Sequence, residues 1–250
     1  MQPEITKDVV IKLLGIVDAG LTNGLGVQEP GRFCVEAAVC YALGLPHGDD
    51  PLCVAPALRS LKIRLNDSRW SSDQARAKGL RRLAVIQLGS KGHLNAKEFA
   101  TRCAVLAIKT SVPIGLRAAA SIHKDPKHVQ ALRDAANRCE TEGSRQSVLD
   151  AREVARSARR DADAASAAYA AAATGAAAYA SAAYAAAAAD ASAAAADAAA
   201  AYAAAAADAA DASAARDKSL ADFAEGVVQI LIEMKVPAIR WLALTELEVA

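Results

Sequence analysis

The sequence from Ala171 to Ala215, AAATGAAAYASAAYAAAAADASAAAADAAAAYAAAAADAADASAA, decides the fold class of this protein. Alanine is the strongest helix former, because its methyl group loses no rotamer freedom when the backbone becomes helical. As one helix, the 52 residues from 164 to 215 would extend about 78 Å at 1.5 Å per residue. The tract therefore predicts a long helical element in an all-α protein.

The larger side chains of this tract follow the helical repeat. Tyr184 and Tyr202 lie 18 residues apart, and 18 residues make about five helical turns. Asp190 and Asp208 have the same separation, and Asp197 lies 11 residues before Asp208, close to three turns. We therefore expect an acidic edge, a tyrosine shoulder and a face of bare alanine that lets another helix approach to about 8 Å. These tyrosines and aspartates are candidate partner-binding residues.

Two arrangements of the tract remain open. One helix can run from about Arg145 to about Arg216, or Thr174 and Gly175 can form a turn that folds the tract into a hairpin. In either case the alanine face requires a neighbour. That neighbour is another helix of this chain or a second copy of the protein, so a homodimer is possible.

The rest of the chain also shows helical spacing of its apolar residues and no alternating strand pattern. Only 4% of the residues are aromatic, which favours closely packed helices over a sandwich or barrel. Helices are predicted over residues 4–21, 33–43, 54–65, 72–88, 96–110, from 126 onward, and 218–234. Three helix starts carry capping residues, namely Ser71 with Gln74, Asn95 with Glu98, and Asp125 with Pro126. We expect a helical N-terminal domain over 1–143. The second part, over 144–250, is expected to hold the long alanine-rich helix and a C-terminal amphipathic helix and to pack on the first domain.

Cysteine usage and the N-terminus indicate the compartment. The five cysteines are odd in number and form no CxxC pair, which predicts reduced thiols in the cytoplasm. The sequence starts without the basic and apolar regions of a signal peptide. Asp190, Asp197 and Asp208 interrupt the alanine tract, and each would cost about 2.5–3.5 kcal/mol at a bilayer centre, so no membrane partner is expected.

Charge is distributed unevenly along the chain. The net charge of +1 is the sum of −4 over residues 1–58, +13 over 59–160 and −8 over 161–250. A middle segment this basic indicates either an anionic partner or an internal match with the acidic ends.

The richest basic stretch runs from Arg64 to Arg82 and surrounds a capped helix start. Guanidinium groups beside a helix N-terminus suit phosphate or carboxylate, and an indole can stack on a base. The candidate residues for a small anionic ligand are Arg69, Trp70, Arg76, Arg81 and Arg82. The alternative is a solvated helix face with a buried tryptophan.

A second basic run begins the long helical tract. Arg152, Arg156 and Arg159 share one helical face, with Arg145 and Arg160 nearby. Together with residues 59–82, this run over 145–160 makes nucleic-acid binding an alternative function. Salt bridges to the acidic C-terminal region are an equally simple explanation.

Other reactive side chains gather early in the sequence, namely Cys34, Cys40, His47, Asp49, Asp50 and Cys53. They lack the paired close spacings of zinc ligands, so neither a metal nor a cofactor is expected. A Cys34–His47 pair would make the protein a cysteine-dependent enzyme, although no orienting residue is evident. The glycines from Gly24 onward match no nucleotide motif and suit a loop that connects helices.

Two parts of the sequence carry a family resemblance. Tracts such as AAYAAAAAD (182–190), with PGRFCVEAAVCYALGLPHGDDPLCV (30–54) and RLNDSRWSS (64–72), resemble uncharacterised alanine-rich proteins of bacteria and phages. Some of those look like toxin-immunity proteins. The resemblance implies a role in bacterial or phage conflict and transfers no catalytic residue. The leading hypothesis is thus a non-enzymatic binding protein that neutralises a toxin or immune effector or sequesters an anionic, nucleotide-like ligand.

Overall fold

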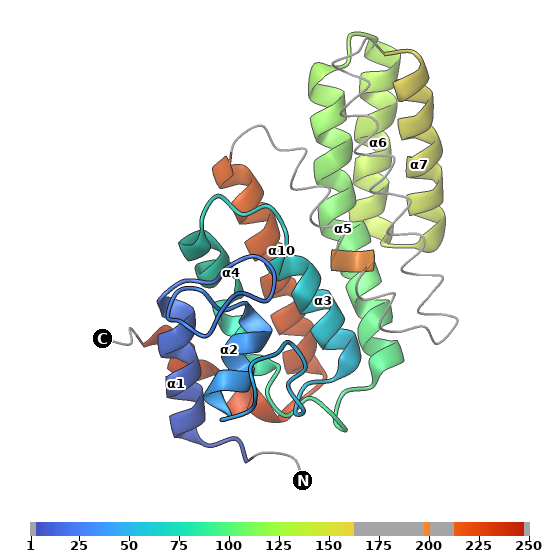
Figure 1. Cartoon of the computed structure of the whole chain (residues 1–250). Coiled ribbons are helices and arrows are strands. Elements are labelled where there is room, and N and C mark those ends of the chain that lie inside the picture. The colour runs from blue at the N-terminus through green and yellow to red at the C-terminus, as the bar shows by residue number, and fades with distance from the viewer. Residues whose placement is uncertain (1–3, 163–197, 201–212, 248–250) are drawn as a thin grey trace.

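The structure, a computed structural model, describes residues 4–162, 198–200 and 213–247 (Figure 1). The described residues are all-α, as the sequence predicts, and contain no strand beyond isolated bridges of Phe33 with Leu21 and Gly26. The named elements are α1 (Lys7–Asp18), α2 (Val35–Ala42), α3 (Pro56–Asn66), α4 (Asp73–Ile86), α5 (Ala96–Ile122), α6 (Pro126–Glu142), α7 (Arg145–Arg160), α10 (Ser213–Glu233) and the 3-10 helix η1 (Pro237–Glu246).

The body of the protein combines both ends of the chain. α10 packs along α4 and α5, and η1 covers α4 and α1, so the C-terminal segment is built into the N-terminal helices (Figure 1). Fully buried large side chains fill this core, with Leu13 from α1, Leu58 from α3, Leu80 from α4 and Phe223 from α10. Burial of such side chains contributes about 1.5–3 kcal/mol each.

A three-helix bundle of α5, α6 and α7 extends from the body (Figure 1). α5 belongs to both parts, because it contacts α3 and α10 as well as α6 and α7. It continues to Ile122, beyond the predicted end at residue 110, and passes through Pro113. Apolar positions at helical spacing, such as Ile108, Val112 and Leu116, remain buried across the proline, and their burial offsets its cost of about 3 kcal/mol.

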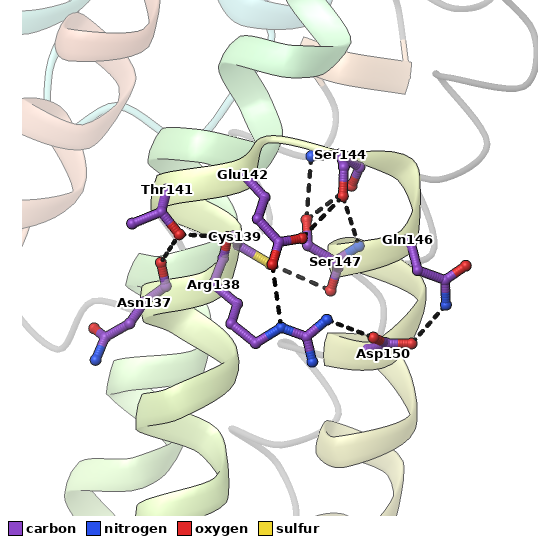
Figure 2. Close-up of polar contacts among 9 residues, drawn as sticks. All are labelled: Asn137, Arg138, Cys139, Thr141, Glu142, Ser144, Gln146, Ser147 and Asp150. Carbon is purple, nitrogen blue, oxygen red and sulfur yellow. Dashed lines mark hydrogen bonds and ion pairs between the residues drawn. The ribbon is translucent and has the colours of Figure 1, made fainter.

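The turn from α6 into α7 is tightly defined by polar contacts (Figure 2). Gly143 adopts a left-handed conformation with φ 59°, which ends α6. Ser144 then caps α7 in a reciprocal capping box with Ser147. Arg138 of α6 binds Asp150 of α7 at 2.7 Å, which holds the two helices in register.

The prediction of one continuous helix from Arg145 to Arg216 is wrong, because α7 ends at Arg160. Two histidines contact the C-terminal end of α7. The buried ring of His123 lies 3.0 Å from the carbonyl oxygen of Ala158, one of the last carbonyls of α7. His128 Nε2 lies 2.8 Å from the carboxylate of Asp161, the C-cap residue. His123 thus contacts a backbone carbonyl that a further helical turn would use, and His128 contacts the side chain of the C-cap residue.

Of the alanine tract, the structure describes residues 198–200, which are helical with Ala199 and Ala200 fully buried, and residues 213–215, which begin α10. The candidate partner-binding residues Tyr184, Asp190, Asp197, Tyr202 and Asp208 lie outside the described residues, as does the possible turn at residues 174–175. The predictions about them stay predictions.

The caps of three helices can be compared with their predictions. Asn95 and Asp125 are confirmed as the N-caps of α5 and α6. At α4 the predicted pair of Ser71 and Gln74 is wrong, because the hydroxyl of Ser72 accepts the hydrogen bond from Ala75 N–H. Ser71 is instead turned outward to the carboxylate of Asp217.

The length and composition of α5 alone would allow it to cross a membrane. In the structure 61% of its most apolar window is buried inside the protein. A helix that runs through both the body and the bundle needs such an apolar surface for packing.

Candidate functional site

A groove lies between α4 and α10 and has a volume of about 560 Å³. Gly79 of α4 and Ala221 of α10 both line it, and a Cβ on Gly79 would lie 3.4 Å from the Cβ of Ala221. Ala75 and Ala214 continue the lining with small side chains. Such side chains leave an open channel where larger residues would fill the space between the helices.

Trp70 forms one wall of this groove. It precedes α4 and is 7% exposed, and its indole N–H donates to the carbonyl of Leu65 at 2.9 Å. The ring rests against Gly79, where a Cβ would lie only 2.4 Å from a ring carbon. Gly79 is therefore required by the packed indole, which is mostly unavailable for stacking on a base.

The rims of the groove carry opposite charges. Lys78 and Arg82 come from α4, whereas Asp222 and Glu225 come from α10. Arg82 Nε lies 3.1 Å from a Glu225 carboxylate oxygen, so the two rims are partly joined. Lys218, also on α10, pairs with Asp222 at 2.5 Å. The charges of the groove therefore nearly cancel, and a net anion gains little from this site.

Two of the predicted anion-binding arginines hold the fold together. Arg76 is 6% exposed and donates to the backbone carbonyls of Asn66 and Leu21, each at 2.7 Å. Arg81 binds both carboxylate oxygens of Asp18, at 2.6 and 2.9 Å, and also contacts C-terminal carbonyls.

The other predicted residues are Arg69, Trp70 and Arg82. Trp70 and Arg82 meet in the groove, and the Arg69 side chain is exposed while its carbonyl accepts from Arg216. Sequence reasoning missed Lys78, Asp222 and Glu225. A lone glycine within a helix that follows a tryptophan was the available signal for a close approach at Gly79.

A second polar centre is fully buried. Lys62 Nζ of α3 lies 3.2 Å from Glu36 Oε1 of α2, and both side chains are 0% exposed. Apart from each other, neither group has a hydrogen-bond partner among the described residues. Burial raises the pKa of Glu36 and lowers the pKa of Lys62, while their mutual attraction opposes both shifts. The pair joins α2 to α3, although the removal of both charges from water carries a high free-energy cost.

The early cysteines, His47 and the aspartates have structural contacts. Cys34 caps α2, since its sulfur accepts from Ala37 N–H at 3.3 Å, and burial raises the pKa of its thiol. His47 lies against the Gly26 carbonyl, while Asp49 and Asp50 face Arg59. Among the described residues, no three His, Cys, Asp or Glu side chains are placed to hold a metal ion.

The glycine-containing loop before α2 directs its amide groups inward. Gly24 N–H donates to the carboxylate of Asp67 at 2.9 Å, and Val35 N–H donates to the side-chain oxygen of Asn66 at 3.2 Å. These amides are therefore engaged by side chains from the end of α3, which makes the loop a helix connection.

Comparison with protein-family models, curated proteins and solved structures finds no significant match to this chain.

Proposed function

We propose that this chain is a non-enzymatic binding protein that recognises a segment of a protein partner in the groove between α4 and α10. The observation that carries the proposal is the groove itself, about 560 Å³ in volume and lined by small side chains, one indole and charges of both signs. A peptide or helix that buries apolar side chains and presents both charges matches such a lining. The setting we propose is cytoplasmic, in bacterial or phage conflict, with a toxin or immune effector as the partner.

Charge favours a protein segment over a small anionic ligand. The basic groups of the groove are opposed by Asp217, Asp222 and Glu225, and Arg82 is already paired. Arg76 and Arg81 are engaged within the body. A nucleotide-like ligand would meet these carboxylates as well as the cations, which weakens its binding.

The state of the thiols also supports binding over cysteine-dependent catalysis. All five cysteines are buried. Burial raises the pKa of Cys34 and of Cys53, and it raises the pKa of Cys40 to about 11. A thiol in this environment is protonated at neutral pH and is a poor nucleophile.

Site-directed crosslinking tests the proposal. A photoreactive residue at position 78, in the groove, is expected to capture a partner that the same residue at position 127, on α6, does not. The captured protein is then purified and titrated by calorimetry. Ala75→Trp, which fills the groove, should weaken its binding at least tenfold, whereas Ala131→Trp, at another half-buried helical position, should change it less than twofold.

Two outcomes would contradict the proposal. One is binding of the purified partner that Ala75→Trp leaves unchanged. The other is a nucleotide or cyclic nucleotide that raises the melting temperature of the parent and loses this effect in Ala75→Trp, which would make the groove an anion site.

A further inference from the structure

The basic charge of the middle segment divides into two parts with different surroundings. In α3 and α4, cations pair with carboxylates from other segments of the chain. Arg59 pairs with Asp49 at 2.7 Å and Arg82 with Glu246 at 2.8 Å. Lys62 and Arg81 are likewise paired with N-terminal carboxylates. The basic run over 59–82 is thus largely matched within the molecule.

The basic run of α7 is arranged differently. Arg145, Arg152, Arg156 and Arg159 are separated by seven, four and three residues. At about 100° per residue they fall within roughly 60° of the helix circumference. With a rise of 1.5 Å per residue, this arginine face extends about 21 Å along α7. We use the name arginine face for these four residues.

Asp150 of α7 is turned away from the arginine face and toward α6. Asp150 binds Arg138 of α6 at 2.7 Å and accepts from Gln146 on the same edge of α7 (Figure 2). This pairing lowers the pKa of Asp150, which therefore remains ionised and satisfied.

The arginine face has few carboxylates near it in the part of the chain that the structure describes. Its only ion pair there joins Arg156 to Glu153, one turn away on the same helix, with the Glu153 side chain 66% exposed. Such an exposed pair contributes little. Arg145 and Arg159 are exposed, whereas Arg152 and Arg156 are half-buried. The Nε of Arg152 is buried and has no hydrogen-bond partner among the described residues.

From these observations we infer that the arginine face binds the phosphate backbone of nucleic acid, without reading its sequence. Guanidinium groups bind phosphate oxygens in a bidentate manner and remain charged at every physiological pH. The face lies on a rigid three-helix bundle whose residues 96–160 hold 13 Lys/Arg and seven Asp/Glu. Duplex DNA carries one charge per about 1.7 Å, so a face of about 21 Å spans enough phosphates to engage all four arginines.

Fluorescence anisotropy with labelled duplex and single-stranded DNA tests this inference on the full-length protein. Three or four phosphate contacts predict a slope of about −3 to −4 for the logarithm of the duplex binding constant against the logarithm of salt concentration. The variant Arg145→Glu with Arg159→Glu should weaken binding at least tenfold and make the slope shallower by about two.

A matched variant separates the arginine face from general charge. Lys127→Glu with Arg133→Glu changes the net charge equally at two exposed cations of α6 and should weaken binding less than threefold. Equal losses in the two double variants would overturn the inference. If the Glu variant melts more than a few degrees lower, Arg145→Gln with Arg159→Gln takes its place, with Lys127→Gln and Arg133→Gln as its control.

Two further outcomes bear on the partner. Polyglutamate that competes with DNA at equal charge would show that the face recognises acidic protein segments, and it would overturn the nucleic-acid assignment. Salt-independent or absent DNA binding would also overturn the nucleic-acid assignment. Ala75→Trp, which blocks the groove between α4 and α10, should leave DNA binding unchanged, so this inference and the proposed function can fail separately.

Discussion

Glu36 and Lys62 face each other at 3.2 Å inside the core, with 0% of either side chain exposed. Such a pair contributes little net stability, because desolvation of two charges cancels much of their attraction. Removal of one partner is far more costly, since it leaves the other charge buried alone. The pair therefore favours the correct apposition of α2 and α3 over arrangements that would separate its members.

Lys62→Met should destabilise the protein by about 3–5 kcal/mol at neutral pH. Burial already raises the pKa of Glu36, and loss of the lysine removes the main opposing attraction, so the pKa rises further above its ordinary value of 4.5. The folded state then holds a proton that the unfolded chain releases. Stability is greatest below pH 4.5 and falls by about 1.4 kcal/mol per pH unit up to the raised pKa.

Urea unfolding at several pH values between 4 and 8 measures this effect. The double variant Glu36→Gln with Lys62→Met corrects for other titrating groups, because it lacks the carboxyl. A single variant whose stability follows that of the double variant at every pH would show that Glu36 is not desolvated.

At the scale of elements, the packing of Trp70 against α4 depends on one glycine. A Cβ on Gly79 would lie 2.4 and 2.6 Å from two carbons of the Trp70 ring. Because the ring is fixed by its bond to the Leu65 carbonyl, it has little freedom to retreat. The same contact shapes the groove, so helix packing and the candidate site share a cause.

Gly79→Ala should therefore destabilise the protein by about 1–3 kcal/mol, despite the higher helix propensity of alanine. Gly15→Ala on α1 is the matched control, since nothing lies within 4 Å of its Cβ position. It should stabilise the protein by about 0.4–1 kcal/mol. Thermal unfolding measures both changes, and a stabilising Gly79→Ala would contradict the packing of Trp70.

At the scale of the whole molecule, carboxylates from both ends of the chain form ion pairs with arginines of α4. The acidic first segment supplies Asp18 to Arg81, and the acidic C-terminal segment supplies Glu225 and Glu246 to Arg82. Arg81 also donates to the Leu247 carbonyl, so two adjacent residues of α4 connect the two ends of the chain. The C-terminal helices complete the core that the N-terminal helices begin.

All five thiols are buried, which predicts low reactivity of the native protein. Burial raises the pKa of Cys40 and of Cys139 to about 11. At pH 8 a disulfide reagent that releases a coloured thiolate should react slowly with the native protein. In denaturant it should titrate five thiols quickly. One native thiol that reacts as fast as free cysteine would indicate an accessible nucleophile.

The site could be predicted only in part. Trp70 and Arg82 were among the predicted residues and do line the groove, but Arg76 and Arg81 were indistinguishable from them by sequence. All are basic or aromatic residues around one helix start. Their different contacts depend on Leu21, Asp18 and the C-terminal carbonyls, which are distant along the chain.

The sequence by itself determined the all-α class, most helix positions and the caps at Asn95 and Asp125, because helix propensity and capping act over one or two turns. Only the tertiary structure decided that α7 ends at Arg160, that α5 continues through Pro113, and which arginines are matched internally. The physical reason is that burial and ion pairing join residues far apart in sequence, and these contacts outweigh local preferences of a few tenths to one kcal/mol per residue.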